Sequence, residues 1–293
     1  MEIKHVAVVG AGFMGSGIAQ VSAQAGYRVT LIDIAAERLA FALSSIEWSL
    51  AKLEAKDQLG DAASAVAGRI ETSVDYTAAR GADLVVEAVF EDIGAKRDTL
   101  RALDAVCRPD AIFGSNTSTI PIARLAEASA RPERVVGMHF FGPVPLMRLV
   151  EITPHPGCAP EVVDAALAFG RSVGKRPVLV KKDVPGFIMN RIFGAMTCEA
   201  IRLVEDGTGT IEDIDQGMCD GFNLRVGPLC IADLAGLDIA LNAFQVMHDL
   251  DPARMPAPPA LLVRMVAEGR LGAKSGEGFY RWEQNGKRVA AAF

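Results

Sequence analysis

One histidine and one glutamate are spaced so that they could form a proton-transfer pair. His139 stands among aromatic residues in the segment 138–141, and Glu151 lies in the next apolar segment. The two residues are equally far from Pro145, in the rigid turn sequence 142–145, so they face each other if the chain folds back there. A carboxylate on one imidazole nitrogen fixes the tautomer and stabilises the imidazolium. Such a pair can remove a proton from a hydroxyl, although a purely structural histidine–glutamate pair is the alternative.

A glycine-rich segment near the N-terminus could hold phosphate groups. The apolar residues 6–9 predict a short strand, and Gly10-Ala11-Gly12-Phe13-Met14-Gly15 follows directly and leads into a predicted helix. In this context Gly10 permits the turn, Gly12 lets a pyrophosphate approach the backbone and Gly15 lets the helix pack on the strand. The N–H groups at a helix start attract phosphate. An ordinary glycine turn in an α/β protein is the alternative.

An acidic residue follows the second predicted strand, where dinucleotide-binding folds bind ribose. Residues 28–33 are predicted to form a strand that ends at Asp33, roughly 20 residues beyond the glycines. A carboxylate there accepts hydrogen bonds from ribose hydroxyls and repels a 2′-phosphate. The segment therefore predicts NAD in preference to NADP, while Arg38 nearby is a residue that favours the phosphorylated cofactor.

Two further polar segments are ambiguous on sequence alone. Ser115-Asn116-Thr117-Ser118 ends another predicted strand, at the edge of the sheet where α/β proteins bind ligands. Asn190 stands early in the helix predicted after Pro185-Gly186. Each could hydrogen-bond a substrate, and each could instead serve only the adjoining helix start.

Alternating strand and helix patterns over residues 1–184 predict the elements that position these side chains. They indicate an α/β fold with a doubly wound, mainly parallel sheet of Rossmann type. Residues 56–69, predicted as a second helix or a loop, lengthen the crossover between the second and third strands. The predicted strands are 5–10, 28–33, 83–88, 111–116, 134–141, 149–153 and 176–181, and the predicted helices are 14–26, 35–55, 94–107, 121–128 and 160–173.

The pattern changes at residues 181–186, where proline and glycine interrupt it. Thr210 with Asp213 resembles a helix cap in the region that follows. We therefore expect two domains, a dinucleotide-binding domain over 1–184 and an all-α domain over 185–293 whose apolar faces suit burial in a dimer. The helices predicted in the second domain are 187–205, 211–219, 231–250 and 260–268.

Composition argues against several classes of partner. The chain of 293 residues is 50% hydrophobic with a formal net charge of −6, which disfavours nucleic acid and anionic membranes. No apolar run reaches the roughly 20 residues of a membrane span, and a strand predicted from residue 5 leaves no room for a signal peptide. The five cysteines are scattered without a C-x-x-C pair, so we expect reduced thiols in a cytoplasmic protein, with no zinc site and no disulfide framework.

Several motifs, in the same order along nearly the whole chain, resemble the L-3-hydroxyacyl-CoA dehydrogenase family. Together they are far more specific than any one of them. The matching segments are 10–19, Glu87-Ala88-Val89-Phe90-Glu91-Asp92, Ser115-Asn116-Thr117-Ser118, 139–151, 183–191, Gly227-Pro228 and Lys274-Ser275-Gly276-Glu277-Gly278-Phe279-Tyr280.

The resemblance implies a reaction and the residues that catalyse it. His139 would be the base on a 3-hydroxyl group, and the acid in the reverse direction, with Glu151 orienting it and balancing its charge. Ser118 and Asn190 would hydrogen-bond the substrate near its reacting carbon and thioester. The implied reaction of fatty-acid metabolism is hydride transfer between NAD and C3 of a short-chain L-3-hydroxyacyl-CoA or its 3-ketoacyl-CoA.

The resemblance also implies binding residues and an assembly. Ser49 and Lys56 would hold coenzyme A, with Lys52 assisting, since cations suit its anionic phosphates. The helical domain would bind substrate and form a homodimer. The residues assigned to the nicotinamide side of the cofactor are Glu91 and Lys96, with help from Lys274. Ser118 would also contact the cofactor.

Two positions depart from the family pattern. Gly142 stands where the family usually has an asparagine near the nicotinamide, and Arg225 lies in a segment, 222–226, that is usually aromatic and proline-rich. They leave open a dehydrogenase of the same fold for a small non-CoA hydroxy acid or aldehyde, of the carnitine, gulonate or pyridine-aldehyde type. A third hypothesis is a non-enzymatic nucleotide-binding protein, against which the complete set of four catalytic residues argues.

Overall fold

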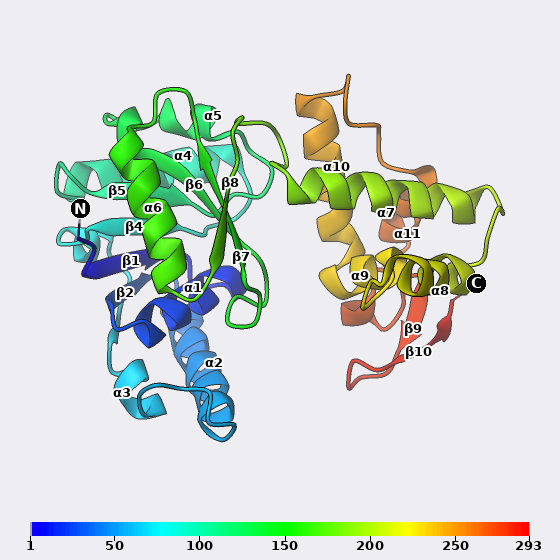
Figure 1. Ribbon diagram of the computed structural model, residues 1–293, viewed down its shortest axis with the longest axis horizontal. Coiled ribbons are helices and arrows are strands. Elements are labelled where there is room, and N and C mark those ends of the chain that lie inside the picture. The colour runs from blue at the N-terminus through cyan, green and yellow to red at the C-terminus, as the bar shows by residue number, and fades with distance from the viewer. Residues whose placement is uncertain (1, 293) are drawn as a thin grey trace. The chain divides into compact units, whose positions relative to one another are not determined.

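The chain divides into two units, Met1–Val184 and Pro185–Phe293, in a computed structural model that describes residues 2–292. The first unit is built on an eight-stranded sheet with the order β3-β2-β1-β4-β5-β6-β7-β8 (Figure 1). Neighbouring strands are parallel except β6 and β7, which pair antiparallel. The strands are β1 (His5–Val9), β2 (Arg28–Ile32), β3 (Ile70–Ser73), β4 (Leu84–Glu87), β5 (Ile112–Ser115), β6 (Val135–Phe140), β7 (Leu149–Pro154) and β8 (Arg176–Leu179).

The apolar runs of the central strands are buried by helices, as expected for a parallel sheet. The side chains of α1, α2 and α6 share one core with these strands, and Figure 1 shows α6 lying across the sheet. The helices of this unit are α1 (Phe13–Gln24), α2 (Ala36–Glu54), α3 (Ala63–Ala67), α4 (Ile93–Val106), α5 (Ile122–Ala126) and α6 (Pro160–Ser172), with 3₁₀ turns at Tyr76–Ala79 and Pro132–Arg134.

The predicted doubly wound, mainly parallel sheet is confirmed. Each strand and helix predicted in this unit is present, with ends that differ by a few residues. Strand β3 was not predicted, because it is an edge strand in which only Ile70 is buried and Glu71 and Thr72 face solvent. Such a short, polar segment carries no alternation of apolar residues.

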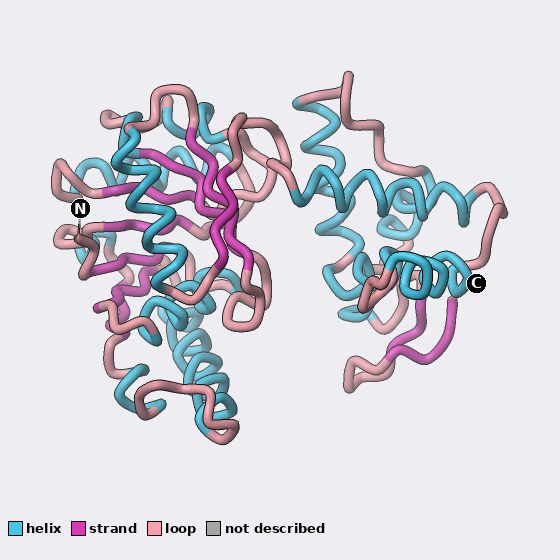
Figure 2. Tube along the Cα trace, viewed as in Figure 1, coloured by secondary structure: helices cyan, strands magenta, loops and turns pink. Residues whose placement is uncertain are grey.

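The second unit is mainly helical, as predicted, and it has a core of its own. In addition to the helices, a short antiparallel pair of strands lies near the C-terminus, magenta in Figure 2. An all-α description therefore omits this hairpin. The elements are α7 (Met189–Glu205), α8 (Ile211–Phe222), α9 (Pro228–Ala235), α10 (Leu237–Leu250), α11 (Ala260–Ala267), a 3₁₀ turn at Ala273–Ser275, β9 (Tyr280–Trp282) and β10 (Arg288–Ala291).

The prediction of a single helix over residues 231–250 is wrong, because the chain bends between α9 and α10 and forms two helices there. Gly236 at the junction has φ +99°, a conformation that favours glycine, and the two helices meet at 101°. The predicted cap is confirmed, since the side chain of Thr210 accepts the N–H of Asp213. Within residues 2–292, no single helix passes a test of length and apolarity for crossing a membrane; α9 and α10 pass it only as this bent pair.

Candidate active site

The glycine segment joins β1 to α1 in the conformation that its spacing predicts. Gly10 has φ +101°, and its N–H donates to the carbonyl of Ile32 at 2.7 Å, which ties the turn to the end of β2. A Cβ at Gly15 would overlap the carbonyl oxygen of Gly10, whereas a Cβ at Gly12 would meet nothing within 4 Å. The loop is therefore tight where it meets the protein and open on the side that a ligand would approach.

The acid after β2 supports this loop from below. Asp33 is 7% exposed, and its Oδ2 accepts the N–H of Ala11 at 2.8 Å while Oδ1 accepts the N–H of Ala35 at 3.1 Å. Among the described residues no side chain caps the start of α1, where Phe13 lies exposed. The glycine loop 10–15, here called the glycine cradle, and the uncapped start of α1 offer N–H donors that fit a pyrophosphate. The carboxylate of Asp33 beside them is an acceptor that fits the hydroxyls of a ribose.

Strands β6 and β7 place His139 directly opposite Glu151, so the predicted pairing is confirmed. The Nδ1 atom of His139 lies 2.8 Å from Oε2 of Glu151, whose side chain is wholly buried. With Glu151 ionised, Nδ1 is the donor in this contact, because a carboxylate can only accept, and Nε2 is the nitrogen that can take a proton. The imidazole also packs against the ring of Phe141, with centroids 4.4 Å apart. The ring is therefore held in one orientation at the carboxyl end of β6.

A single glutamate organises the polar turn that follows β5. Oε1 of Glu91 accepts the backbone N–H groups of Ser118 at 2.8 Å and Thr119 at 3.0 Å, and the hydroxyl of Thr117 at 2.7 Å. Burial tends to raise the pKa of Glu91, but Lys96 and these hydrogen bonds outweigh it and hold the pKa below its usual value. The turn that carries Ser118 is therefore fixed around a carboxylate.

Lys96 is buried behind this turn, and it contacts the glutamate that holds the turn as well as a second glutamate. Its ammonium donates to Oε1 of Glu87 at 2.8 Å and lies 3.2 Å from Oε2 of Glu91. Burial opposes the charge, yet the two glutamates outweigh that effect and raise the pKa of Lys96. Glu87 was not among the predicted site residues, although its other oxygen accepts the hydroxyl of Ser115 at 2.7 Å. Its signals were a charge that ends the apolar strand β4 and its place at the start of the family-like segment 87–92.

Asn116 is a second site residue that no sequence pattern distinguishes within the cluster 115–118. Its Oδ1 accepts the N–H of Phe140 at 2.9 Å, which joins the end of β5 to the end of β6 next to His139. Ser118 and His139 consequently lie at the same edge of the sheet. That edge, outside the carboxyl ends of parallel strands, is where open α/β sheets bind ligands.

The residues expected to hold coenzyme A lie along or beyond α2. Ser49 lines a cavity of about 160 Å³ that is also lined by residues of α1 and by the turn 143–145. Lys52 is exposed, with its ammonium 3.6 Å from the ring centroid of Trp48. Lys56 is exposed just beyond the end of α2. Of these three residues, only Ser49 lines the cavity beside the turn 143–145.

Gly142 lies in the turn that joins the antiparallel strands β6 and β7, next to the glycine loop. A Cβ on Gly142 would clash with the ring of Phe13 and would lie 3.3 Å from the sulfur of Met14. The ring of Phe13 thus occupies space that a larger residue at position 142 would need.

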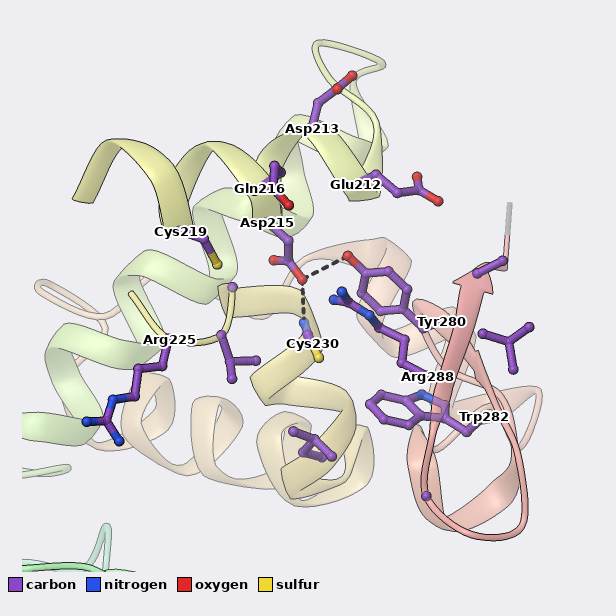
Figure 3. A pocket seen from close by; sticks show the side chains of 16 residues that line it. Glu212, Asp213, Asp215, Gln216, Cys219, Arg225, Cys230, Tyr280, Trp282 and Arg288 are labelled. Atoms are coloured by element: carbon purple, nitrogen blue, oxygen red, sulfur yellow. Dashed lines mark hydrogen bonds between the residues drawn. The ribbon is translucent and has the colours of Figure 1, made fainter. Parts of the chain in front are cut away.

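The remaining expected residues belong to the second unit. Asn190 is the second residue of α7, and the ammonium of Lys274 pairs with Asp238 at 2.6 Å. Arg225 lines a cavity of about 710 Å³ (Figure 3). There the carboxylate of Asp215 accepts a hydrogen bond from the hydroxyl of Tyr280 at 2.9 Å, which fastens the β9–β10 hairpin to α8. None of the residues predicted for catalysis or cofactor binding lines this cavity.

In a comparison with known proteins, both units match the family that the sequence motifs resemble. Residues 5–184 match the family described as 3-hydroxyacyl-CoA dehydrogenase, NAD binding domain, and residues 186–282 match its C-terminal domain. A probable 3-hydroxybutyryl-CoA dehydrogenase from Deinococcus radiodurans is 44% identical over 277 residues, covering 94% of this chain and 99% of the relative.

Two solved structures are similar over almost the whole chain. FadB2 from M. tuberculosis has a TM-score of 0.93 at 37% identity, covering 97% of this chain and 100% of that one. An (S)-3-hydroxybutyryl-CoA dehydrogenase from Ralstonia eutropha has a TM-score of 0.91 at 37% identity, with the same coverage.

The open glycine cradle, the acid after β2 and the histidine–glutamate pair on a Rossmann-type sheet define an NAD-dependent oxidoreductase. The matches to both domains make the family explicit. The chain belongs to the 3-hydroxyacyl-CoA dehydrogenase family, as its motifs predict.

Proposed function

We propose that this protein interconverts a short-chain L-3-hydroxyacyl-CoA and its 3-ketoacyl-CoA, with NAD as cofactor and His139 as general base. The observation that carries the proposal is the buried 2.8 Å contact between His139 and Glu151 at the sheet edge that also bears the glycine cradle. The family and the printed names of the most similar relatives support a CoA ester as substrate.

The histidine–glutamate pair can move a proton in both directions. In the oxidation, Nε2 of His139 takes the proton of the 3-hydroxyl while Nδ1 keeps its hydrogen bond to Glu151, which stabilises the imidazolium. In the reduction, the same nitrogen returns the proton to the forming hydroxyl. Bound NAD supplies the nicotinamide ring that exchanges a hydride with C3.

The other expected residues have binding or orienting roles in this proposal. Ser118, on the turn held by Glu91, and Asn190 hydrogen-bond the substrate near its reacting carbon and thioester. Ser49 and Lys56 hold coenzyme A with help from Lys52. The cofactor contacts are Gly10, Gly12, Phe13, Met14, Gly15, Asp33, Glu91, Lys96, Ser118 and Lys274.

In this proposal, the domain over 1–184 binds the dinucleotide. The domain over 185–293 binds substrate and forms the dimer. Large apolar side chains exposed on the second unit support a homodimer: Ile192, Phe222, Leu234 and Ile239 are each more than half exposed. We place the protein in the cytoplasm, where the five free cysteines stay reduced. We expect neither nucleic acid nor membrane as a partner.

The test is the oxidation of NADH by acetoacetyl-CoA, which is monitored by the loss of NADH absorbance. The same assay with NADPH is the matched control. Turnover with NADH and little with NADPH is expected, because Asp33 disfavours a 2′-phosphate. An enzyme that binds NADH but does not turn over acetoacetyl-CoA would refute the CoA-ester proposal.

One observation favours a second candidate, a dehydrogenase of a small non-CoA hydroxy acid or aldehyde. Gly142 lacks the side chain that the family usually carries beside the cofactor, and Phe13 fills the space where it would stand. Turnover of such a compound in place of acetoacetyl-CoA would establish this candidate.

A further inference from the structure

Lys175 is a buried lysine to which the proposed reaction assigns no role. It is 7% exposed and stands between α6 and β8, directly after Gly174, whose φ of +77° lets the chain turn sharply at the helix end. The backbone N–H of Lys175 donates to the carbonyl of Gly170 at 2.9 Å, which fixes this turn. The side chain therefore leaves a rigid point of the fold.

The ammonium of Lys175 binds backbone carbonyls rather than an acid. It donates to the carbonyl oxygens of Val144 at 2.5 Å and Met147 at 2.9 Å. Within residues 2–292 no carboxylate pairs with it, and burial alone lowers its pKa. An aliphatic side chain would fill the same space without the cost of desolvating a charge. The charge is therefore matched specifically to two inward-facing carbonyls.

Both carbonyls belong to the turn that joins β6 to β7, the strands that carry His139 and Glu151. On its other side this turn packs against α1: Val144 is 1% exposed, and a Cβ on Gly17 would lie 2.8 Å from the Cβ of Val144. Helix α1 starts at the glycine cradle. The turn is thus held between the cofactor-binding helix and the ammonium of Lys175.

We propose that Lys175 is a positioning residue that sets the place of the His139–Glu151 hairpin relative to the glycine cradle, through the carbonyls of Val144 and Met147. It touches neither substrate nor cofactor and acts through the turn. The proposal rests on the catalytic role proposed for His139. Loss of the two hydrogen bonds lets the turn relax and moves the imidazole, while the cradle keeps its own supports at Asp33 and Ile32.

The test compares Lys175→Met, which keeps the length but removes charge and donors, with Lys175→Arg, which keeps both. Lys182→Met, at an exposed lysine, is the matched control. For Lys175→Met we expect kcat to fall about 10- to 100-fold, because a misplaced catalytic group loses rate steeply. The KM for acetoacetyl-CoA and the Kd for NADH should change by less than about threefold, and Lys175→Arg should recover much of kcat.

A second readout does not depend on any substrate. The protein has four histidines, and NMR of their side chains in the free protein, with His139→Gln to assign one signal, reports the imidazole directly. Lys175→Met should displace the His139 signal and leave those of His5 and His248 in place. If acetoacetyl-CoA is not turned over by the unaltered protein, the proposed function fails, while this measurement still decides the role of Lys175.

Two outcomes would overturn the proposal. In one, Lys175→Met retains both kcat and the His139 signal. In the other, all four histidine signals change together, thermal unfolding shifts, and Lys175→Arg restores nothing, which would make Lys175 a residue of general stability only.

Discussion

At the scale of single residues, the proposed chemistry depends on which nitrogen of His139 carries a proton. Glu151 decides this, because its buried carboxylate accepts from Nδ1 and leaves Nε2 basic. The symmetric spacing of the two residues about Pro145 predicted that they would meet. It did not predict Glu87 or Asn116, whose contacts link the ends of separate strands. Such links appear only when the order of the strands is known.

Replacement of Glu151 by Gln tests the orienting role. A neutral amide can hold the ring in either tautomer and does not stabilise an imidazolium, so kcat should fall by about 100-fold or more. The Kd for NADH, measured by fluorescence, should stay near that of the unaltered protein because the glycine cradle is untouched. A kcat within about threefold of the original would contradict the role of Glu151.

At the scale of elements, an ionic cluster holds the turn after β5. Glu91 accepts from three consecutive residues of the turn and is paired with Lys96. The pKa of Glu91 is lowered in the folded protein, so its charge stabilises the fold fully at pH values above its ordinary pKa of 4.5. This contribution is lost as the pH falls below 4.5 and through the lowered pKa of the folded protein.

The pH dependence of a Glu91→Gln variant follows from that sign. Near neutral pH the variant should be less stable by about 1–3 kcal/mol, since hydrogen bonds to a charged group are lost. The difference in the free energy of unfolding, measured with urea across acidic pH, should shrink below pH 4.5 as Glu91 becomes protonated in the unaltered protein. A difference that stays constant at acid pH would show that the charge of Glu91 contributes nothing.

At the scale of the whole molecule, periodicity and glycine spacing were enough to predict a mainly parallel sheet followed by a helical unit. Elements without such a signal were missed: β3 is a polar edge strand, β9 has only three residues, and β10 is almost entirely exposed. The β9–β10 hairpin is held by Asp233, which is 1% exposed and accepts hydrogen bonds from Phe279, Tyr280 and Trp282. A buried aspartate that binds partners distant in sequence has no local pattern to predict it.

The most direct test of His139 as general base compares the unaltered protein with His139→Gln in the reduction of acetoacetyl-CoA by NADH, with the Kd for NADH measured on both. We predict turnover by the unaltered protein and a kcat lower by about 10²- to 10⁴-fold in the variant, with NADH bound equally by both. A variant that turns over at nearly the original rate would contradict the assignment of His139 as the general base.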